Sequence, residues 1–216
     1  MTKPQLSSRD PDYTGGISKT YAEDLLYNEF VNKLSNLHYT LFADKTQSLL
    51  IVLHGVDTSG KDGTIRHAMK AFNPQSCKAF SFKKPNKEEL SNDYLWRIHK
   101  KIPAKGEIII FNRSHYESVI EERVRKLTPE DVWSKRYNQI NEFEKYLFEN
   151  NVRLIKFFLH ISKDKQKKRL KERMDDPNQH WKFSESDIKG RKSWNEYILA
   201  YEEMLENAVL KIFHGI

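Results

Sequence analysis

Short apolar runs alternate along the chain with longer segments in which apolar residues recur at every third or fourth position. The short runs predict buried strands, and the recurring pattern predicts amphipathic helices. Strands that alternate with helices form βαβ units, so the pattern predicts an α/β protein with a mostly parallel sheet covered on both faces. The predicted strands are 49–53 (LLIVL), 77–82 (CKAFSF), 107–111 (EIIIF) and 152–160 (VRLIKFFLH).

The helical pattern occurs in seven segments, and two of them have recognisable start signals. Thr128 is expected to cap a helix in which Pro129 takes the first position, where the missing N–H costs no hydrogen bond. Ser184 and Asp187 have the spacing of a capping box. The predicted helices are 20–43, 61–72, 86–102, a segment from about residue 115, 129–150, 163–176 and 184–205.

Residues 1–19 differ from the rest because they are polar, rich in turn formers and without an apolar period. They are expected to form an arm that is extended or loosely docked. No repeat, low-complexity tract or interior linker separates the other elements. The 216 residues are therefore expected to form one domain with its own core.

Charge changes this picture, because a net charge of +7 makes polyanions the natural partners. Nucleotides, inorganic phosphates and nucleic acid all belong to this class. The single cysteine, Cys77, cannot form an internal disulfide, and the N-terminus shows no secretory apolar segment. We therefore expect a cytoplasmic protein. No apolar stretch approaches bilayer length, so no membrane association is expected.

The segment 54–64, HGVDTSGKDGT, lies between a predicted strand and a predicted helix. Gly55, Gly60 and Lys61 fit the P-loop template through its lysine. The glycines let backbone N–H groups turn inward as an anion nest, the helix N-terminus adds positive potential, and Lys61 reaches the transferring phosphate. A glycine-rich turn that matches the template by chance is the alternative.

Two acids make this loop unusual. Asp62 stands where a hydroxyl residue normally follows the lysine, and Thr64 lies one helical turn beyond Gly60 and is expected to contact phosphate. Asp57 would repel a phosphate unless a cation bridged the two, which makes it the candidate ligand for Mg²⁺. Alternatively, Asp57 caps a turn or pairs with a nearby arginine. Ser59 and Gly63 complete the expected phosphate contacts.

A second motif follows the predicted strand 107–111. Arg113 is expected to point into the crevice at the carboxyl ends of the strands and to stabilise developing phosphoryl charge as a built-in arginine finger. The alternative is a surface arginine at a helix start, where a cation is electrostatically disfavoured. Asn112 stands where P-loop enzymes often have a metal-linked aspartate. His115 has no partner that the sequence identifies.

The segment 163–183 begins with a run rich in lysine and arginine. On a helix, Lys165, Arg169 and Arg173 fall on one face. Such a run is often only a solvated face. It follows the last predicted strand, however, where nucleotide kinases place a lid, and a row of cations opposite a phosphate loop would hold a polyanion longer than a triphosphate tail.

Nucleic acid is not expected as the primary ligand, although the chain is basic. A stacking platform requires aromatic side chains interleaved with basic ones. Most aromatic residues instead fall on predicted core faces. These residues are Phe30, Phe72, Trp96, Phe143, Tyr146, Phe157 and Phe158.

Three motifs together resemble the family-2 polyphosphate kinases, from about residue 20 to the C-terminus. They are GVDTSGKDGTIRH, FNRSHYE and ERMDDPNQHWKFSESDIKGRKSWNEY, in that family's order. The resemblance implies a P-loop kinase-like three-layer α/β/α core with a helical lid. It also implies reversible phosphoryl transfer between inorganic polyphosphate and a nucleotide, with Mg²⁺ as cofactor or Mn²⁺ in its place.

The resemblance also implies roles for individual residues. Asp57 matches the family's metal-linked aspartate, and Lys61 matches its phosphate-loop lysine. Arg113 matches the arginine after the second acidic site, and Arg173 lies in the lid motif. Lys83 is expected to face the polyphosphate path.

The second motif departs from FDRSWYN, the pattern of members that mainly phosphorylate nucleoside diphosphates. Asn112 replaces Asp and weakens one metal site, while Glu117 replaces Asn and is expected to orient a metal-bound water or the acceptor phosphate. This pattern resembles the subgroup that accepts both AMP and ADP. Arg169 and Arg173 are expected to close over the polyphosphate chain.

The sequence thus predicts a polyphosphate-dependent kinase of adenine or guanine nucleotides, without a covalent phosphoenzyme. An ATP-dependent nucleoside or nucleoside-monophosphate kinase is the nearest alternative, and a non-catalytic module that binds polyanions or RNA is the other. A homo-oligomer, dimer or tetramer, is expected, because the arm and the long amphipathic helices offer a surface for it.

Overall fold

A computed structural model gives the structure of the protein and describes residues 5–178 and 190–207. One parallel sheet, in the order β2-β3-β1-β4, runs through the centre of this part of the chain. All four predicted strands are confirmed to within two residues. They are β1 (Ser48–His54), β2 (Cys77–Ser81), β3 (Ile108–Asn112) and β4 (Val152–Phe158).

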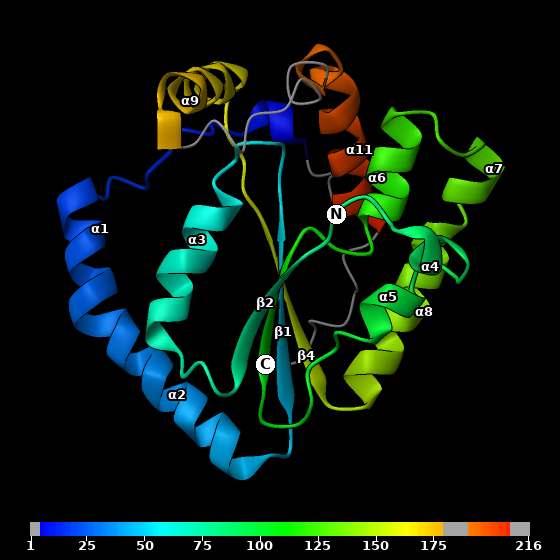
Figure 1. The fold of residues 1–216 in the computed structure, drawn as a ribbon. Helices are drawn as coiled ribbons and strands as arrows, with labels where there is room; N and C mark the ends of the chain where they lie inside the picture. The colour runs from blue at the N-terminus through cyan, green and yellow to red at the C-terminus, as the bar shows by residue number, and fades with distance from the viewer. Residues whose placement is uncertain (1–4, 179–189, 208–216) are drawn as a thin grey trace.

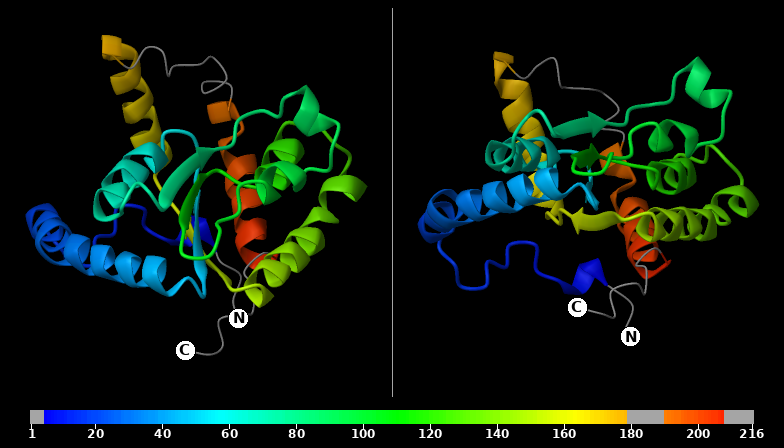
Figure 2. Two further views of the ribbon diagram at one scale, coloured as in Figure 1. Left: turned by 60° about the horizontal axis from the view of Figure 1, so that its bottom comes forward. Right: turned by 90° about the horizontal axis from the view of Figure 1, so that it is seen from below.

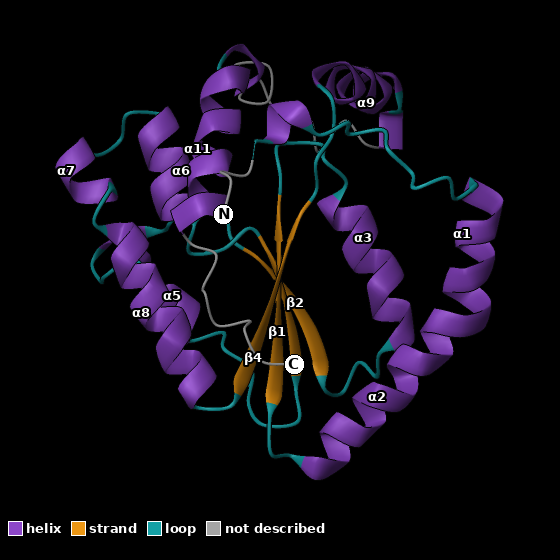
Figure 3. Ribbon diagram, turned by 180° about the vertical axis from the view of Figure 1, so that it is seen from behind, coloured by secondary structure: helices purple, strands orange, loops and turns teal. Residues whose placement is uncertain are grey.

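Helices cover both faces of the sheet, which confirms the three-layer architecture (Figures 1 and 3). The chain crosses the sheet in one direction from β1 to β2 and in the other from β2 through β3 to β4. Because such crossovers are right-handed, opposite directions place the helices on opposite faces. One face carries α1 (Lys19–Leu25), α2 (Val31–Asp44) and α3 (Lys61–Ala68), which is followed by a 3₁₀ turn η3 (Met69–Ala71).

The opposite face carries the short helices after β2 and the helices that follow β3, together with the C-terminal helix. A further helix, α9 (Lys163–Asp175), lies across the carboxyl ends of the strands (Figure 3). The helices of the second face are α4 (Lys87–Leu90), α5 (Trp96–His99), α6 (Glu117–Val124), α7 (Glu130–Trp133), α8 (Arg136–Glu149) and α11 (Trp194–Asn207).

The core lies on both sides of the sheet. Every residue of β3 is buried, as expected for a continuous apolar run whose two faces are both covered. One buried cluster joins Tyr116 and Ile140 to Tyr201 of α11. Another joins Leu53 and Ile65 to the strands on the α3 side. The sheet therefore acts as a rigid support, and its carboxyl edge is the place where loops from several strands meet.

The helix predicted over 86–102 is divided into α4 and α5. The carboxylate of Asp93 accepts hydrogen bonds from the backbone N–H groups of Leu95 and Trp96, at 2.9 and 3.1 Å. This Asx-type contact stops one helix and starts the next, which the apolar spacing alone did not indicate.

The helix predicted over 129–150 is likewise divided, into α7 and α8. Pro129 has extended backbone angles (φ −62°, ψ 157°) and is the residue that precedes α7, so Thr128 lies outside the helix. The predicted cap was therefore placed one residue too early. The proposed capping box of Ser184 and Asp187 lies outside the described residues.

The long N-terminal helix is confirmed, with a π-helical segment η2 (Leu26–Phe30) between α1 and α2. The preceding arm contains a short 3₁₀ helix η1 (Leu6–Ser8) and is docked at one point. Leu6 is buried, and its N–H donates to Glu202 Oε1 of α11 at 2.7 Å. Figure 2 shows the arm crossing from α11 to the far end of α1.

The expectation that the seven aromatic rings lie on core faces is wrong for three of them. Phe30, Tyr146 and Phe157 are each about half exposed. Phe30 lies on the long helix, whose outer surface the described fold does not cover. Within the described ranges, no helix combines the length and apolar character needed to cross a membrane.

Candidate active site

The loop between β1 and α3 has the backbone that its glycines predict. Gly55 has a φ of +142°, and a Cβ there would lie 2.7 Å from Ser59 Oγ and 2.8 Å from the Leu159 carbonyl oxygen. Gly60 has a φ of +106° and is the residue that caps α3. Only glycine adopts these conformations without strain, so the glycines of the motif are required by the turn.

The side chain of Lys61 is buried and folds back over this loop. Its Nζ donates to the carbonyl oxygens of Gly55 and Val56 at 2.6 and 3.1 Å, and lies 3.4 Å from Ser59 Oγ. Burial lowers the pKa of Lys61, and the positive charge of Arg113 lowers it further, while nearby carboxylates offset part of the effect. Lys61 is therefore a buried cation at the amino end of α3.

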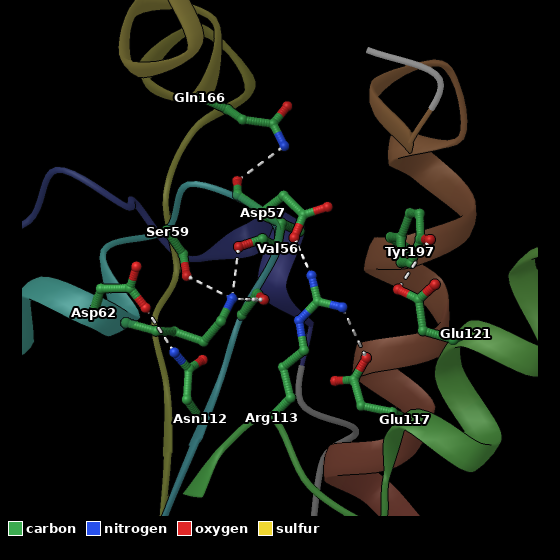
Figure 4. A network of polar contacts seen from close by, with 12 residues as sticks. Val56, Asp57, Ser59, Asp62, Asn112, Arg113, Glu117, Glu121, Gln166 and Tyr197 are labelled. Atoms are coloured by element: carbon green, nitrogen blue, oxygen red, sulfur yellow. Dashed lines mark hydrogen bonds and ion pairs between the residues drawn. The ribbon is translucent and has the colours of Figure 1, made fainter. Parts of the chain in front are cut away.

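Arg113 comes from the end of β3 and points at the loop (Figure 4). Its guanidinium pairs with the carboxylate of Asp57, and Nη1 lies 3.8 Å from Glu117 Oε2. Burial alone would lower the pKa of Arg113, but these two carboxylates outweigh it and raise the pKa. The crevice position expected for Arg113 is confirmed, and the alternative of a surface arginine is wrong.

The pairing with Arg113 also bears on the two alternatives given for Asp57, a metal ligand or the partner of an arginine. The alternative in which Asp57 pairs with an arginine is the one that the structure shows. This pairing uses Oδ1 and does not exclude a cation at the same carboxylate. A metal role for Asp57 stays a prediction.

Asp62 links two of the motifs. Asn112 Nδ2 donates to Asp62 Oδ1 at 2.7 Å, which ties the first turn of α3 to the end of β3. Thr64 Oγ1 donates to the carbonyl oxygen of Gly60 at 3.3 Å, so this hydroxyl contacts the backbone of its own helix. At Gly63 an added Cβ would meet open space, so internal packing does not require this glycine.

Glu117 begins α6, where an acidic residue suits the positive end of the helix dipole. Burial raises its pKa to about 7, although Arg113 acts in the opposite direction. The neighbouring Glu121 raises the pKa further. Glu121 itself accepts a hydrogen bond from Tyr197 at 3.1 Å and pairs with Arg125 at 2.5 Å.

A small cavity lies at the carboxyl edge of the sheet. Gly55, Val56, Asp57 and Arg113 line one side of it, α6 contributes Glu117 and Glu121, and α9 contributes Gln166. From α11 come Trp194, Tyr197 and Tyr201. The Tyr201 hydroxyl donates to the carbonyl oxygen of Gly55 at 3.2 Å and so fixes the start of the loop.

Sequence reasoning missed Glu121, Gln166 and the α11 aromatics. Glu121 lies four residues after Glu117, and Tyr201 lies four after Tyr197, so each pair shares a helix face. That spacing was the available signal. It could not show which face meets the cavity, because apolar spacing on α11 also fits an ordinary core helix.

Helix α9 covers the loop from above. Ser162 caps it by accepting the N–H of Lys165 at 3.1 Å. Arg169 Nη1 donates to the carbonyl oxygen of Thr58 at 3.0 Å. Gln166 Nε2 donates to the carbonyl oxygen of Asp57 at 3.2 Å (Figure 4). Arg169 thus reaches the loop, while Lys165 is exposed.

The other two predicted residues lie farther out. Arg173 is half-buried one turn along α9, and Lys83 is exposed on the loop after β2. Neither Arg173 nor Lys83 is among the described residues that line the cavity. The first half of the predicted lid is therefore a helix over the site, and its movement stays a prediction. Residues 179–183 lie outside the described residues.

The oxygen ligands at this site suit a hard cation such as Mg²⁺ that is bound jointly by the protein and by substrate phosphates. In the described part of the chain, no group of three or more Asp, Glu, His or Cys side chains could hold a metal alone. Mg²⁺ is commonly bound through one or two carboxylates together with substrate phosphates. Asp57, inside a phosphate-binding loop, fits that arrangement.

The site has three parts that define a phosphoryl-transfer enzyme of the P-loop kinase class. They are a P-loop with a buried lysine, an arginine from the neighbouring strand, and a helix that brings a second arginine to the loop. The chain belongs to the polyphosphate kinase 2 (PPK2) family, whose model matches residues 18–212.

Individual relatives agree with this assignment. An AMP/ADP-polyphosphate phosphotransferase of Meiothermus ruber is 45% identical over 202 residues, which are 92% of this chain and 74% of that protein. An ADP-polyphosphate phosphotransferase of Rhodopseudomonas palustris is 42% identical over 208 residues, which are 91% and 71%. The crystal structure of polyphosphate kinase 2 from Arthrobacter aurescens TC1 has a TM-score of 0.91 at 39% identity and covers 96% of this chain and 75% of its own.

The pKa of Glu117 predicts a pH-dependent stability. Between pH 4.5 and about 7 the folded protein keeps a proton on Glu117 that the unfolded chain has released, so this residue's contribution to stability is lost as the pH rises. In Glu117→Gln that loss is absent. Relative to wild type, the variant should gain on the order of 2 kcal/mol of unfolding free energy between about pH 5 and about pH 8.

Denaturant unfolding at several pH values measures this difference. Glu149→Gln, an exposed change of the same kind on α8, is the control and should follow the wild-type profile. Parallel profiles for wild type and Glu117→Gln would contradict the raised pKa.

Proposed function

We propose that this protein is a polyphosphate-dependent nucleotide kinase. It transfers phosphoryl groups reversibly between inorganic polyphosphate and nucleoside mono- or diphosphates, from AMP to ADP and from ADP to ATP. The observation that carries the proposal is that Asp57 and Arg113 pair at one cavity, while Lys61 binds the carbonyl oxygens of two loop residues that line it. Membership of the PPK2 family and 45% identity to an AMP/ADP-polyphosphate phosphotransferase support it.

The residues suit a reaction that needs positioning and charge neutralisation more than covalent chemistry. The loop N–H groups and Lys61 bind the phosphates, and Arg113 stabilises the charge that develops on the transferring group. Arg169 and Arg173 on α9 hold the polyphosphate chain, with Lys83 along its path. No side chain needs to form a phosphoenzyme.

Asp57 would hold Mg²⁺, or Mn²⁺ in its place, and the bound ion would neutralise phosphate charge next to Lys61. The carboxylate is already inside the loop and has a second oxygen besides the one that Arg113 contacts. The same loop and the start of α3 contain the other expected phosphate contacts, Ser59, Gly60, Gly63 and Thr64. The open space at Gly63 lets a phosphate approach the backbone of α3 closely.

The acceptor is an adenine or guanine nucleotide. Asn112 and Glu117 favour acceptance of both the monophosphate and the diphosphate, because this pair resembles the subgroup that uses AMP and ADP. Glu117 would orient the acceptor phosphate through Arg113, whose Nη1 lies 3.8 Å from Glu117 Oε2. The lone cysteine supports a cytoplasmic location.

One assay tests the reaction itself. The protein is incubated with AMP, Mg²⁺ and polyphosphate in the absence of ATP, and ADP and ATP are measured by chromatography. Both products are expected. If no product forms until ATP replaces polyphosphate as donor, the protein is an ATP-dependent kinase; if neither donor gives turnover, it is a binding module, and the proposal fails in both cases.

The two cations of the site generate a second prediction. Lys61→Ala and Arg113→Ala should each lower kcat by about two to three orders of magnitude, because each removes a charge that stabilises the transition state. Initial rates at saturating polyphosphate and AMP measure the effect, with circular dichroism to verify folding. Lys78→Ala removes an exposed lysine that pairs with Glu107 outside the site and should keep full activity. Full activity in either site variant would refute the assigned roles.

We also infer that the protein is a homo-oligomer that uses its long N-terminal helix. Tyr27, Phe30, Leu34 and Leu37 are 45%, 45%, 36% and 66% exposed and follow the three- and four-residue spacing of a helix-packing stripe. The charged neighbours Glu29 and Lys33 pair with each other. A second copy of the same helix offers a matching stripe, and a two-fold pair would bury both.

Leu37→Lys should therefore reduce the oligomer to a monomer, because it places a charge in the middle of the stripe. Light scattering coupled to size-exclusion chromatography measures the mass. Leu127→Lys, at a leucine that is 65% exposed away from this helix, should leave the mass unchanged. A monomeric wild type, or an unchanged mass for Leu37→Lys, would rule out this interface.

A further inference from the structure

The second motif contains two residues, His115 and Tyr116, that do not line the cavity. Both contact the buried carboxylate of Glu144 on α8. His115 Nε2 lies 3.1 Å from Glu144 Oε1, and the Tyr116 hydroxyl donates to the same oxygen at 2.7 Å. Lys156 of β4 donates to Glu144 Oε2 at 2.7 Å and to the Tyr116 hydroxyl at 3.0 Å.

Glu144 is ionised despite its burial. The side chains of His115 and Glu144 are both fully buried. Burial raises the pKa of Glu144, but the hydrogen bond from His115 and the charge of Lys156 outweigh it, so the pKa lies below its ordinary value. Because an ionised carboxylate can only accept hydrogen bonds, the proton of His115 lies on Nε2. Three donors thus converge on one carboxylate.

The two residues held by this carboxylate begin two positions after a strained residue. Arg113 has a φ of +64°, a left-handed conformation that costs a non-glycine residue about 1–2 kcal/mol. Its N–H donates to the carbonyl oxygen of Leu53 at 3.1 Å, which fixes the chain on one side. On the other side, Ser114 Oγ accepts the N–H of Tyr116 at 3.2 Å, and His115 and Tyr116 are held by Glu144.

We propose that Glu144 is a positioning residue for Arg113. By binding the side chains of His115 and Tyr116, Glu144 holds the loop between β3 and α6 in the conformation that aims the Arg113 guanidinium at Asp57. Helix α8 and strand β4 thereby fix a site residue from beneath the cavity. The inference rests on the proposed function, because the turnover rate reports on it.

Glu144→Gln keeps the size of the side chain but replaces one acceptor oxygen with an N–H₂ group. The amide cannot satisfy all three donors, so Lys156 or the pair of His115 and Tyr116 loses its contact. We expect kcat to fall on the order of 100-fold, as for a misplacement of a site group, while the KM for AMP changes by less than about threefold. Glu149→Gln, an exposed change on the same helix, should have no effect.

A double-mutant cycle distinguishes positioning from a general loss of structure. Added to Arg113→Ala, the Glu144→Gln change should lower the remaining kcat by less than about twofold, because the residue that it positions is already gone. An equal fall in both backgrounds, or a fall through KM alone, would overturn the proposal. An inactive wild type would instead refute the proposed function.

If Glu144→Gln does not fold, as judged by circular dichroism, Tyr116→Phe takes its place in the same cycle. It removes one hydroxyl and keeps the packed ring. A fall in kcat of about tenfold that disappears in the Arg113→Ala background supports the proposal. Wild-type kcat in Tyr116→Phe, or an equal fall in both backgrounds, overturns it.

Discussion

Lys61 is buried and Arg113 is half-buried at the carboxyl edge of the sheet, and the protein must keep both cations charged. A buried charge is costly unless it is paired and hydrogen-bonded. Carbonyl oxygens of the loop surround Lys61, and two carboxylates flank Arg113. Asp57 is an unusual residue in a loop that binds anions. Its carboxylate, however, offsets part of the cost of removing the Arg113 charge from water.

The order of the strands brings these groups together. The strands β1 and β3 are neighbours in the sheet although a whole βα unit separates them in sequence. Their following segments leave toward opposite faces, so the phosphate loop and the Arg113 loop meet at a point where no helix intervenes. Helix α9 then covers this point, and α11 supplies the aromatic wall.

Much of this could be predicted from sequence because it depends on local pattern. The strands are apolar runs, and the glycines of the loop mark the turn that requires them. The break in 86–102 depends on one Asx contact of Asp93, and the partner of His115 lies 29 residues away on another element. Likewise, apolar spacing identified the helix of Phe30 but not which of its faces the fold would leave exposed.

The docked arm belongs to the same structural unit as the region that the family model matches. The family match begins at residue 18, yet Leu6 belongs to the same buried cluster as Tyr197 and Tyr201. Those two tyrosines line the cavity, and Glu202, which binds the Leu6 N–H, follows Tyr201 directly. A segment that precedes the match to the family model thus packs behind the wall of the cavity, and a boundary drawn at the first long helix would cut through the core that supports this wall.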